Sequence, residues 1–222
     1  MQLYNLVLQT YAVVTLIAIA VYFVTRKHQE PVMGYLALML IGSFISDAIV
    51  MADSYWFHTG RKISIVSNAY GLVEIVTVMI LYRMKLSPDK NLPFMILALA
   101  LIAMQIVELT VFRDIFSFPG TTRAAFAIAV TILGLMYFFK MIMDLPAVHI
   151  YSIPMFWINS GMLVYFTGNF FLFMIEYYLV SVLKNNMIYY WSFHNAMGII
   201  SYVMIAVGLW TAKKQAPGIQ TR

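Results

Sequence analysis

Five ionisable side chains fall inside long apolar stretches of this sequence: Asp47, Glu74, Glu108, Glu176 and His194. A charge is costly in such a stretch, so each residue is a hypothesis for a binding or proton-handling site. The lysines and arginines, in contrast, fall at the ends of the stretches or in the polar segments between them, and none is expected at membrane depth. We therefore expect the carboxyl groups to be protonated, hydrogen-bonded to polar neighbours, or neutralised by a proton, a metal ion or a cationic ligand.

Helical spacing puts these residues on polar faces that also carry small side chains. Ser67, Gly71 and Glu74, for example, share one face of a helix, because residues three and four apart are neighbours there. Such faces pack against other helices in membrane proteins. The same reasoning along the chain selects six candidates for ligand binding: Asp47, Glu74, Asn169, Glu176, His194 and Ser201.

Interfacial pairing is the competing explanation for several of these residues. Glu108 precedes Arg113 by five residues and Glu176 precedes Lys184 by eight, so both glutamates can form ion pairs near the membrane surface. His194 is as well suited to an interfacial hydrogen bond as to a ligand role. These alternatives stay open at the level of the sequence.

Glu74 is the hardest of the five to explain as interfacial, because it lies deepest in its apolar stretch. A charged residue facing lipid at that depth costs at least about 2.5 to 3.5 kcal/mol. We predict that Glu74 faces the protein interior, within hydrogen-bonding reach of a polar residue on the second, sixth or seventh helix. Asp47, Asn169 and Ser201 are the first candidates. If no base pairs with it, the carboxyl group should be protonated, and Glu74→Gln should be mild for folding whereas Glu74→Lys should be severe.

Seven stretches of about 20 largely apolar residues carry these side chains, and about 20 helical residues cross the hydrocarbon core of a bilayer. The sequence lacks the alternation of a membrane β-barrel, and it is 63% hydrophobic and only 10% charged. We predict an all-α bundle of seven transmembrane helices that forms a single domain over residues 1–222, without a soluble domain. The predicted spans lie near residues 3–25, 32–53, 63–83, 93–112, 122–143, 154–179 and 190–212.

The basic residues predict the orientation of this bundle. With the N-terminus outside, nine lysines and arginines fall on the inner side and five on the outer side. Arg26 and Lys27 follow the first stretch directly. We predict a multi-pass protein of the cytoplasmic (inner) membrane with a cytoplasmic C-terminus. The basic residues stand singly or in pairs at helix ends, so they indicate topology and no nucleic-acid partner is expected.

Motifs for catalysis and cofactor binding are missing. The chain has no cysteine and no His-Glu-x-x-His motif, which leaves His58, Glu108 and His194 as weak candidates for metal ligands. A retinal protein needs a buried lysine, and the seventh predicted span contains none, so we do not expect retinal. No catalytic residue is assigned, and a non-enzymatic role is favoured.

The segment from Tyr137 to Trp210 carries a resemblance to known proteins. Its runs are YFFK from 137, DLP from 144, PMFWINSG from 154, YFTGNFFLF from 165 and WSFHN from 191. It resembles seven-helix membrane proteins of the Bacteroidota that often form the membrane region of histidine kinases. The resemblance implies a sensory role and a cytoplasmic C-terminus. The sequence ends at Arg222 without a kinase, so a separate partner would have to carry the output.

We therefore expect a sensory or signalling module that binds a small ligand or cation in a polar cavity in its outer half. Its expected partners are the lipid bilayer, that ligand, and a histidine kinase or other signalling protein. Two alternatives stay open. One is a metal-dependent membrane hydrolase built from Asp47, His58, Glu108, Glu176 and His194, and the other is a proton- or cation-coupled transporter with Glu74 as carrier.

Overall fold

The computed structural model describes residues 2–57, 59, 63–144, 149–182 and 187–214, and the regular structure in these residues is helical. Seven of the helices are long and apolar enough to cross a membrane, which confirms the prediction of an all-α, multi-pass membrane protein. Their ends lie within three residues of the predicted spans when the π-helical turn after α4 is included. They are α1 (Gln2–Thr25), α2 (Met33–Ala52), α3 (Ser64–Leu86), α4 (Leu92–Val107), α5 (Gly120–Asp144), α6 (Pro154–Val182) and α7 (Met187–Lys214).

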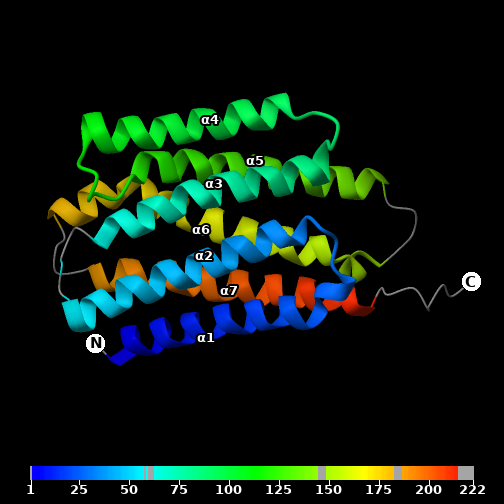
Figure 1. The fold of residues 1–222 in the computed structure, drawn as a ribbon, viewed down its shortest axis with the longest axis horizontal. Coiled ribbons are helices and arrows are strands. Elements are labelled where there is room, and N and C mark those ends of the chain that lie inside the picture. Colours follow the sequence, from blue (N-terminus) through cyan, green and yellow to red (C-terminus); the bar gives the residue numbers. More distant parts are fainter. Residues whose placement is uncertain (1, 58, 60–62, 145–148, 183–186, 215–222) are drawn as a thin grey trace, which may run out of the picture.

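Local sequence explains where several helices begin and end. Pro93 and Pro154 stand in the first turns of α4 and α6, where the missing N–H of proline costs little. The helices α2 and α4 each continue into a π-helical turn, Asp53–Phe57 and Glu108–Phe112, whose first residue is acidic. Both turns lie at the end of the bundle where α1, α3, α5 and α7 begin (Figure 1). We call this the N-terminal end.

Six of the helices form a closed ring. The helix α4 lies outside it, at the edge of the bundle (Figure 1). Around the ring, α1 contacts α2, α2 contacts α3, α3 contacts α5, α5 contacts α6, α6 contacts α7, and α7 returns to α1. The helix α4 packs against α3 and α5 and buries only Leu101 and Gln105. The ring is therefore the frame in which an internal site can form.

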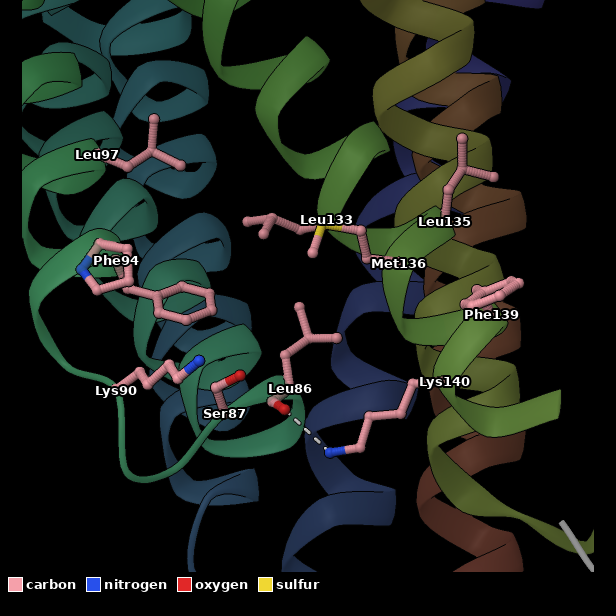
Figure 2. A pocket seen from close by; sticks show the side chains of 11 residues that line it. Leu86, Ser87, Lys90, Phe94, Leu97, Leu133, Leu135, Met136, Phe139 and Lys140 are labelled. Atoms are coloured by element: carbon pink, nitrogen blue, oxygen red, sulfur yellow. Dashed lines mark hydrogen bonds between the residues drawn. The ribbon is translucent and has the colours of Figure 1, made fainter. Parts of the chain in front are cut away.

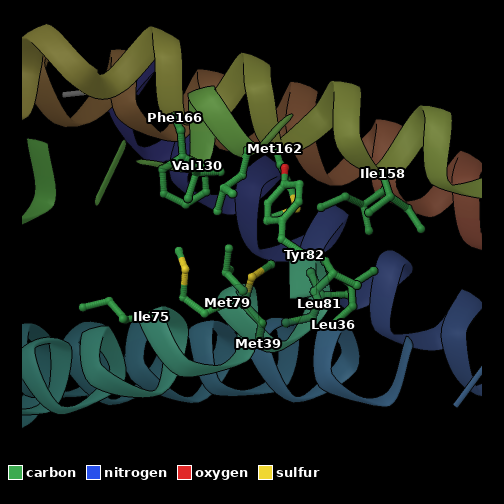
Figure 3. Packing of buried hydrophobic residues seen from close by; sticks show 14 of the residues in the cluster. Leu36, Met39, Ile75, Met79, Leu81, Tyr82, Val130, Ile158, Met162 and Phe166 are labelled. Carbon is green, nitrogen blue, oxygen red and sulfur yellow. The ribbon is translucent and has the colours of Figure 1, made fainter. Parts of the chain in front are cut away.

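Apolar side chains fill the middle of the ring and the half remote from the N-terminal end (Figure 3). Tyr82, Ile158 and Met162 are almost completely buried there. The Tyr82 hydroxyl donates to Asn159 Oδ1 at 2.8 Å, and Asn159 Nδ2 donates to the Gly134 carbonyl at 3.0 Å. This hydrogen-bonded chain satisfies buried polar groups and ties α3, α5 and α6 together.

Candidate functional site

A polar cavity of about 220 Å³ lies inside the ring near its N-terminal end. All six ring helices line it, whereas α4 contributes no side chain to its wall. This volume is smaller than the roughly 300–1,000 Å³ of sites for drug-sized ligands, so the cavity suits a ligand of few atoms. One lining residue from each helix is Tyr11 (α1), Asp47 (α2), Glu74 (α3), Arg123 (α5), Tyr165 (α6) and His194 (α7).

Glu74 faces this cavity and forms an ion pair with Arg123. Arg123 Nη1 donates to Glu74 Oε2, and Nη2 donates to the Ser67 carbonyl at 3.4 Å. The side chains of Arg123 and Glu74 are only 11% and 8% exposed. The predicted interior orientation of Glu74 is therefore confirmed.

The partner predicted for Glu74 was wrong, because the ion pair is made with α5 and not with the second, sixth or seventh helix. The helix α5 begins at Gly120, so Arg123 stands in its first turn and points into the ring. In the distribution of basic residues, Arg123 counts with those of the outer side, at the end of its predicted span. The expectation that the buried carboxylates lie without basic residues at their depth is corrected accordingly.

Gly71 is the sequence signal that could have located the arginine. It lies one helical turn before Glu74 on the same face of α3, and a Cβ atom there would lie 2.9 Å from Arg123 Cζ. Contacts this close do not occur for real side chains, so the guanidinium group occupies the space that the glycine leaves open. Gly71 and Glu74 therefore share one face of α3, as predicted, and this face contacts the guanidinium group of Arg123.

Asp47 lines the same cavity, and none of the ion pairs in the described part of the chain involves it. Ser43 Oγ lies 3.3 Å from Asp47 Oδ2 and within hydrogen-bonding distance of the hydroxyls of Tyr202 and Tyr11, at 2.9 and 3.3 Å. The Asp47 side chain itself remains accessible to solvent. Because Glu74 is already paired, an ionised Asp47 gives the cavity one negative charge in excess.

Hydrogen bonds from α6 fix the orientation of His194. Asn169 is fully buried, and its Nδ2 donates to the Tyr165 carbonyl at 2.9 Å, which leaves its Oδ1 as an acceptor 3.0 Å from His194 Nδ1. His194 Nδ1 therefore carries the proton, because an amide oxygen can only accept. The other ring nitrogen, Nε2, lies 3.4 Å from the Tyr165 hydroxyl. Asn169 thus positions the histidine from behind the cavity wall.

Glu108 and Glu176 meet at Arg113, and neither glutamate lines the cavity. Arg113 Nε lies 3.2 Å from Glu108 Oε1, as the sequence predicted, and Arg113 Nη1 donates to Glu176 Oε2 at 2.9 Å. Glu108 also accepts two backbone N–H groups of the first turn of α5, at 3.0 and 2.8 Å, where a carboxylate favours the helix dipole. Lys184, the partner predicted for Glu176, lies outside the described residues. The ion pairs and hydrogen bonds of this cluster connect the end of α4 and the start of α5 with α6.

Neither Ser201 nor the metal candidate Glu108 lines the cavity, whereas the metal candidate His194 does. Ser201 is buried where α7 meets α6, and a Cβ atom at Gly161 would lie 2.7 Å from its carbonyl oxygen. His58 lies outside the described residues. Among the residues that the structure does describe, no three His, Asp or Glu side chains are grouped as ligands for a metal ion. Of the six predicted binding residues, the cavity wall contains Asp47, Glu74 and His194.

Comparison of the chain with protein-family models, with curated proteins and with solved structures finds no match. The resemblance of the segment from Tyr137 to Trp210 therefore stays a prediction. The cavity is the feature from which a function can be inferred.

Proposed function

We propose that this protein is a membrane-embedded sensory module that binds a small, positively charged ligand in the cavity of the ring. The observation that carries the proposal is Asp47, a carboxyl group in the cavity wall without a cationic partner in the described residues. Tyr11, Tyr165 and Trp191 line the same space, and aromatic faces attract cations. A carboxylate beside aromatic rings is suited to an ammonium group.

The ring offers a route from ligand binding to an output. Because all six ring helices line the cavity, a ligand that binds one arrangement of the helices more tightly shifts the population toward it. We propose that the remote helix ends pass this change to a separate histidine kinase or other signalling protein. In this proposal the N-terminus lies outside and the C-terminus in the cytoplasm, which the distribution of lysine and arginine supports.

The two alternative functions have weaker support. A transporter needs a path through the bundle, whereas buried side chains such as Tyr82, Ile158 and Met162 fill the ring beyond the cavity. A metal-dependent hydrolase needs a group of ligands, and the described residues contain none. Asp47 has no cationic partner among the described residues and lies beside aromatic rings. A cation site accounts for this arrangement more directly than either alternative does.

Thermal unfolding of the purified protein with tetramethylammonium chloride tests the cation site. A ligand at a hundred times its dissociation constant stabilises a protein by about 2.7 kcal/mol. For a chain of this size, that corresponds to a rise in Tm of roughly 5–10 °C over sodium chloride at equal ionic strength. Asp47→Asn should abolish the rise. Asp144→Asn, which removes the same charge from an exposed position at the end of α5, should preserve it.

Two results would contradict the cation site. One is a wild-type Tm that rises no further with tetramethylammonium than with sodium, and the other is an undiminished rise in Asp47→Asn. The relay is tested separately by purifying the protein from its own membranes under mild conditions. Co-purification of a kinase or another signalling chain is expected, and recovery of this protein alone would argue against the relay.

A further inference from the structure

A second opening lies on the outside of the bundle, between α4 and α5 at the end remote from the N-terminal end (Figure 2). Its volume is about 780 Å³, more than three times that of the internal cavity. Most of its wall is apolar and comes from the facing sides of the two helices, whereas amino groups stand at its mouth. We call it the α4–α5 cleft and define it by Phe94, Leu97, Leu133, Met136, Lys90 and Lys140.

The position of α4 explains why this cleft exists. The helix lies outside the ring, and only two of its side chains, Leu101 and Gln105, are buried. Leu97 lies about one helical turn before Leu101 and Phe94 about two turns before it, and both are only partly buried against the core. An apolar wall of this kind is exposed to the hydrocarbon of a bilayer, so its natural occupant is an acyl chain.

The mouth of the cleft holds two positive charges that have no carboxylate partner among the described residues. Lys140 Nζ donates to the carbonyls of Lys85 and Leu86 at 3.0 and 2.9 Å, which fixes the ammonium group and leaves one of its three N–H donors for another acceptor. Lys90 is exposed in the connection between α3 and α4, two residues before α4 begins. None of the ion pairs between described residues includes either lysine, whereas the neighbouring Lys85 pairs with Glu30 at 2.5 Å.

We propose that the α4–α5 cleft binds an anionic phospholipid. The acyl chain lies against the apolar wall, and the phosphate lies at the mouth, where Lys90, Lys140 and the Ser87 hydroxyl can donate to its oxygens. Basic pockets between membrane helices recognise anionic lipid headgroups in this way. The proposal does not depend on the cation site inside the ring.

The same pair of helices provides a contrast at the N-terminal end. There an opening of about 470 Å³ between α4 and α5 is lined by Met104, Phe112 and Arg113. Its arginine is already bound to two carboxylates, Glu108 and Glu176. Because no positive charge is left in excess there, we expect anionic lipid to prefer the end with the two lysines.

Native mass spectrometry of the delipidated protein in a neutral detergent tests this inference. With equal amounts of phosphatidylglycerol and phosphatidylcholine, the wild type should retain phosphatidylglycerol preferentially. A basic residue near an anionic surface contributes about 1 kcal/mol, so Lys90→Gln should weaken the preference roughly fivefold, and Lys90→Gln with Lys140→Gln should remove it. The matched control is Lys27→Gln, because Lys27 is exposed and lies outside the cleft. This variant should keep the preference for phosphatidylglycerol.

Lys140 also caps α3, so its loss can affect folding, and Lys140→Arg tests the charge without removing it. This variant should keep the preference for phosphatidylglycerol. Equal binding of the two lipids by the wild type would overturn the proposal, as would a loss in Lys27→Gln equal to that in Lys90→Gln. Glycerol 3-phosphate that competes as well as the lipid would show that the apolar wall is not used, and this too would overturn it.

Discussion

Replacing Glu74 by glutamine removes the negative partner of Arg123 and leaves its guanidinium group buried beside a neutral amide. Arg123 and Glu74 are only 11% and 8% exposed, so water cannot compensate for the loss. The mild effect expected for Glu74→Gln in the absence of a paired base therefore no longer applies. Glutamine at this position, and likewise Arg123→Gln, should each destabilise the protein severely.

The expected magnitude follows from the burial of the pair. Removing one partner of a buried ion pair typically costs about 3–5 kcal/mol, because the other charge stays behind without compensation. The double variant, with glutamine at both positions, contains no charge, and its two amides can hydrogen-bond to each other. We expect it to lose only about 1–2 kcal/mol, the scale of an imperfect neutral hydrogen bond. The two substitutions should thus be non-additive by about 4 kcal/mol or more.

A double-mutant cycle measures this coupling. The free energy of unfolding of the four proteins is determined in mixed micelles by titration with a denaturing detergent, with helix content followed by circular dichroism. Glu30→Gln is the control, because Glu30 pairs with Lys85 at the bundle surface and its side chain is 66% exposed. An exposed pair of this kind contributes about 1 kcal/mol or less.

The reasoning would be refuted if both single variants lost less than about 1 kcal/mol, the cost of an exposed pair. It would equally be refuted if the losses of the single variants added up to that of the double variant. Either result would mean that Glu74 and Arg123 do not depend on each other for burial. The arrangement of α3 against α5 at the cavity would then have to be different.

Two further predictions concern the same end of the bundle and use the same unfolding assay. Gly71→Ala should cost about 1–3 kcal/mol, because the added methyl group overlaps the Arg123 guanidinium. Gly34→Ala is the control and should be nearly neutral, because its methyl group would meet no atom closer than 3.7 Å. Equal losses in the two alanine variants would contradict the overlap. Arg113→Gln should cost about 3–5 kcal/mol, since it leaves two buried carboxylates without their cationic partner. Arg113→Lys should recover only part of this loss, because lysine cannot reproduce the planar contact with both carboxylates. A fully stable Arg113→Gln would contradict the network.

Which residues share the cavity could be predicted only in part. Asp47, Glu74 and His194 meet there, as their positions on polar helical faces suggested. Ser201 lies on a face of the same kind, but its carbonyl is packed against Gly161 of α6. Small and polar side chains mark a face that is buried between helices, and they do not distinguish a cavity wall from a tight helix contact.

The seven helices and the inward direction of Glu74 could be predicted from the sequence alone, because both depend on local quantities. The length of an apolar stretch decides whether it can cross a bilayer, and the cost of a charge in lipid decides which way an acidic side chain turns. The pairing of Arg123 with Glu74, and the lack of a cationic partner for Asp47 among the described residues, follow only from the tertiary structure. These partners come from different helices, so the distances between them depend on how the ring closes and on the space left at Gly71, and no local pattern contains that information.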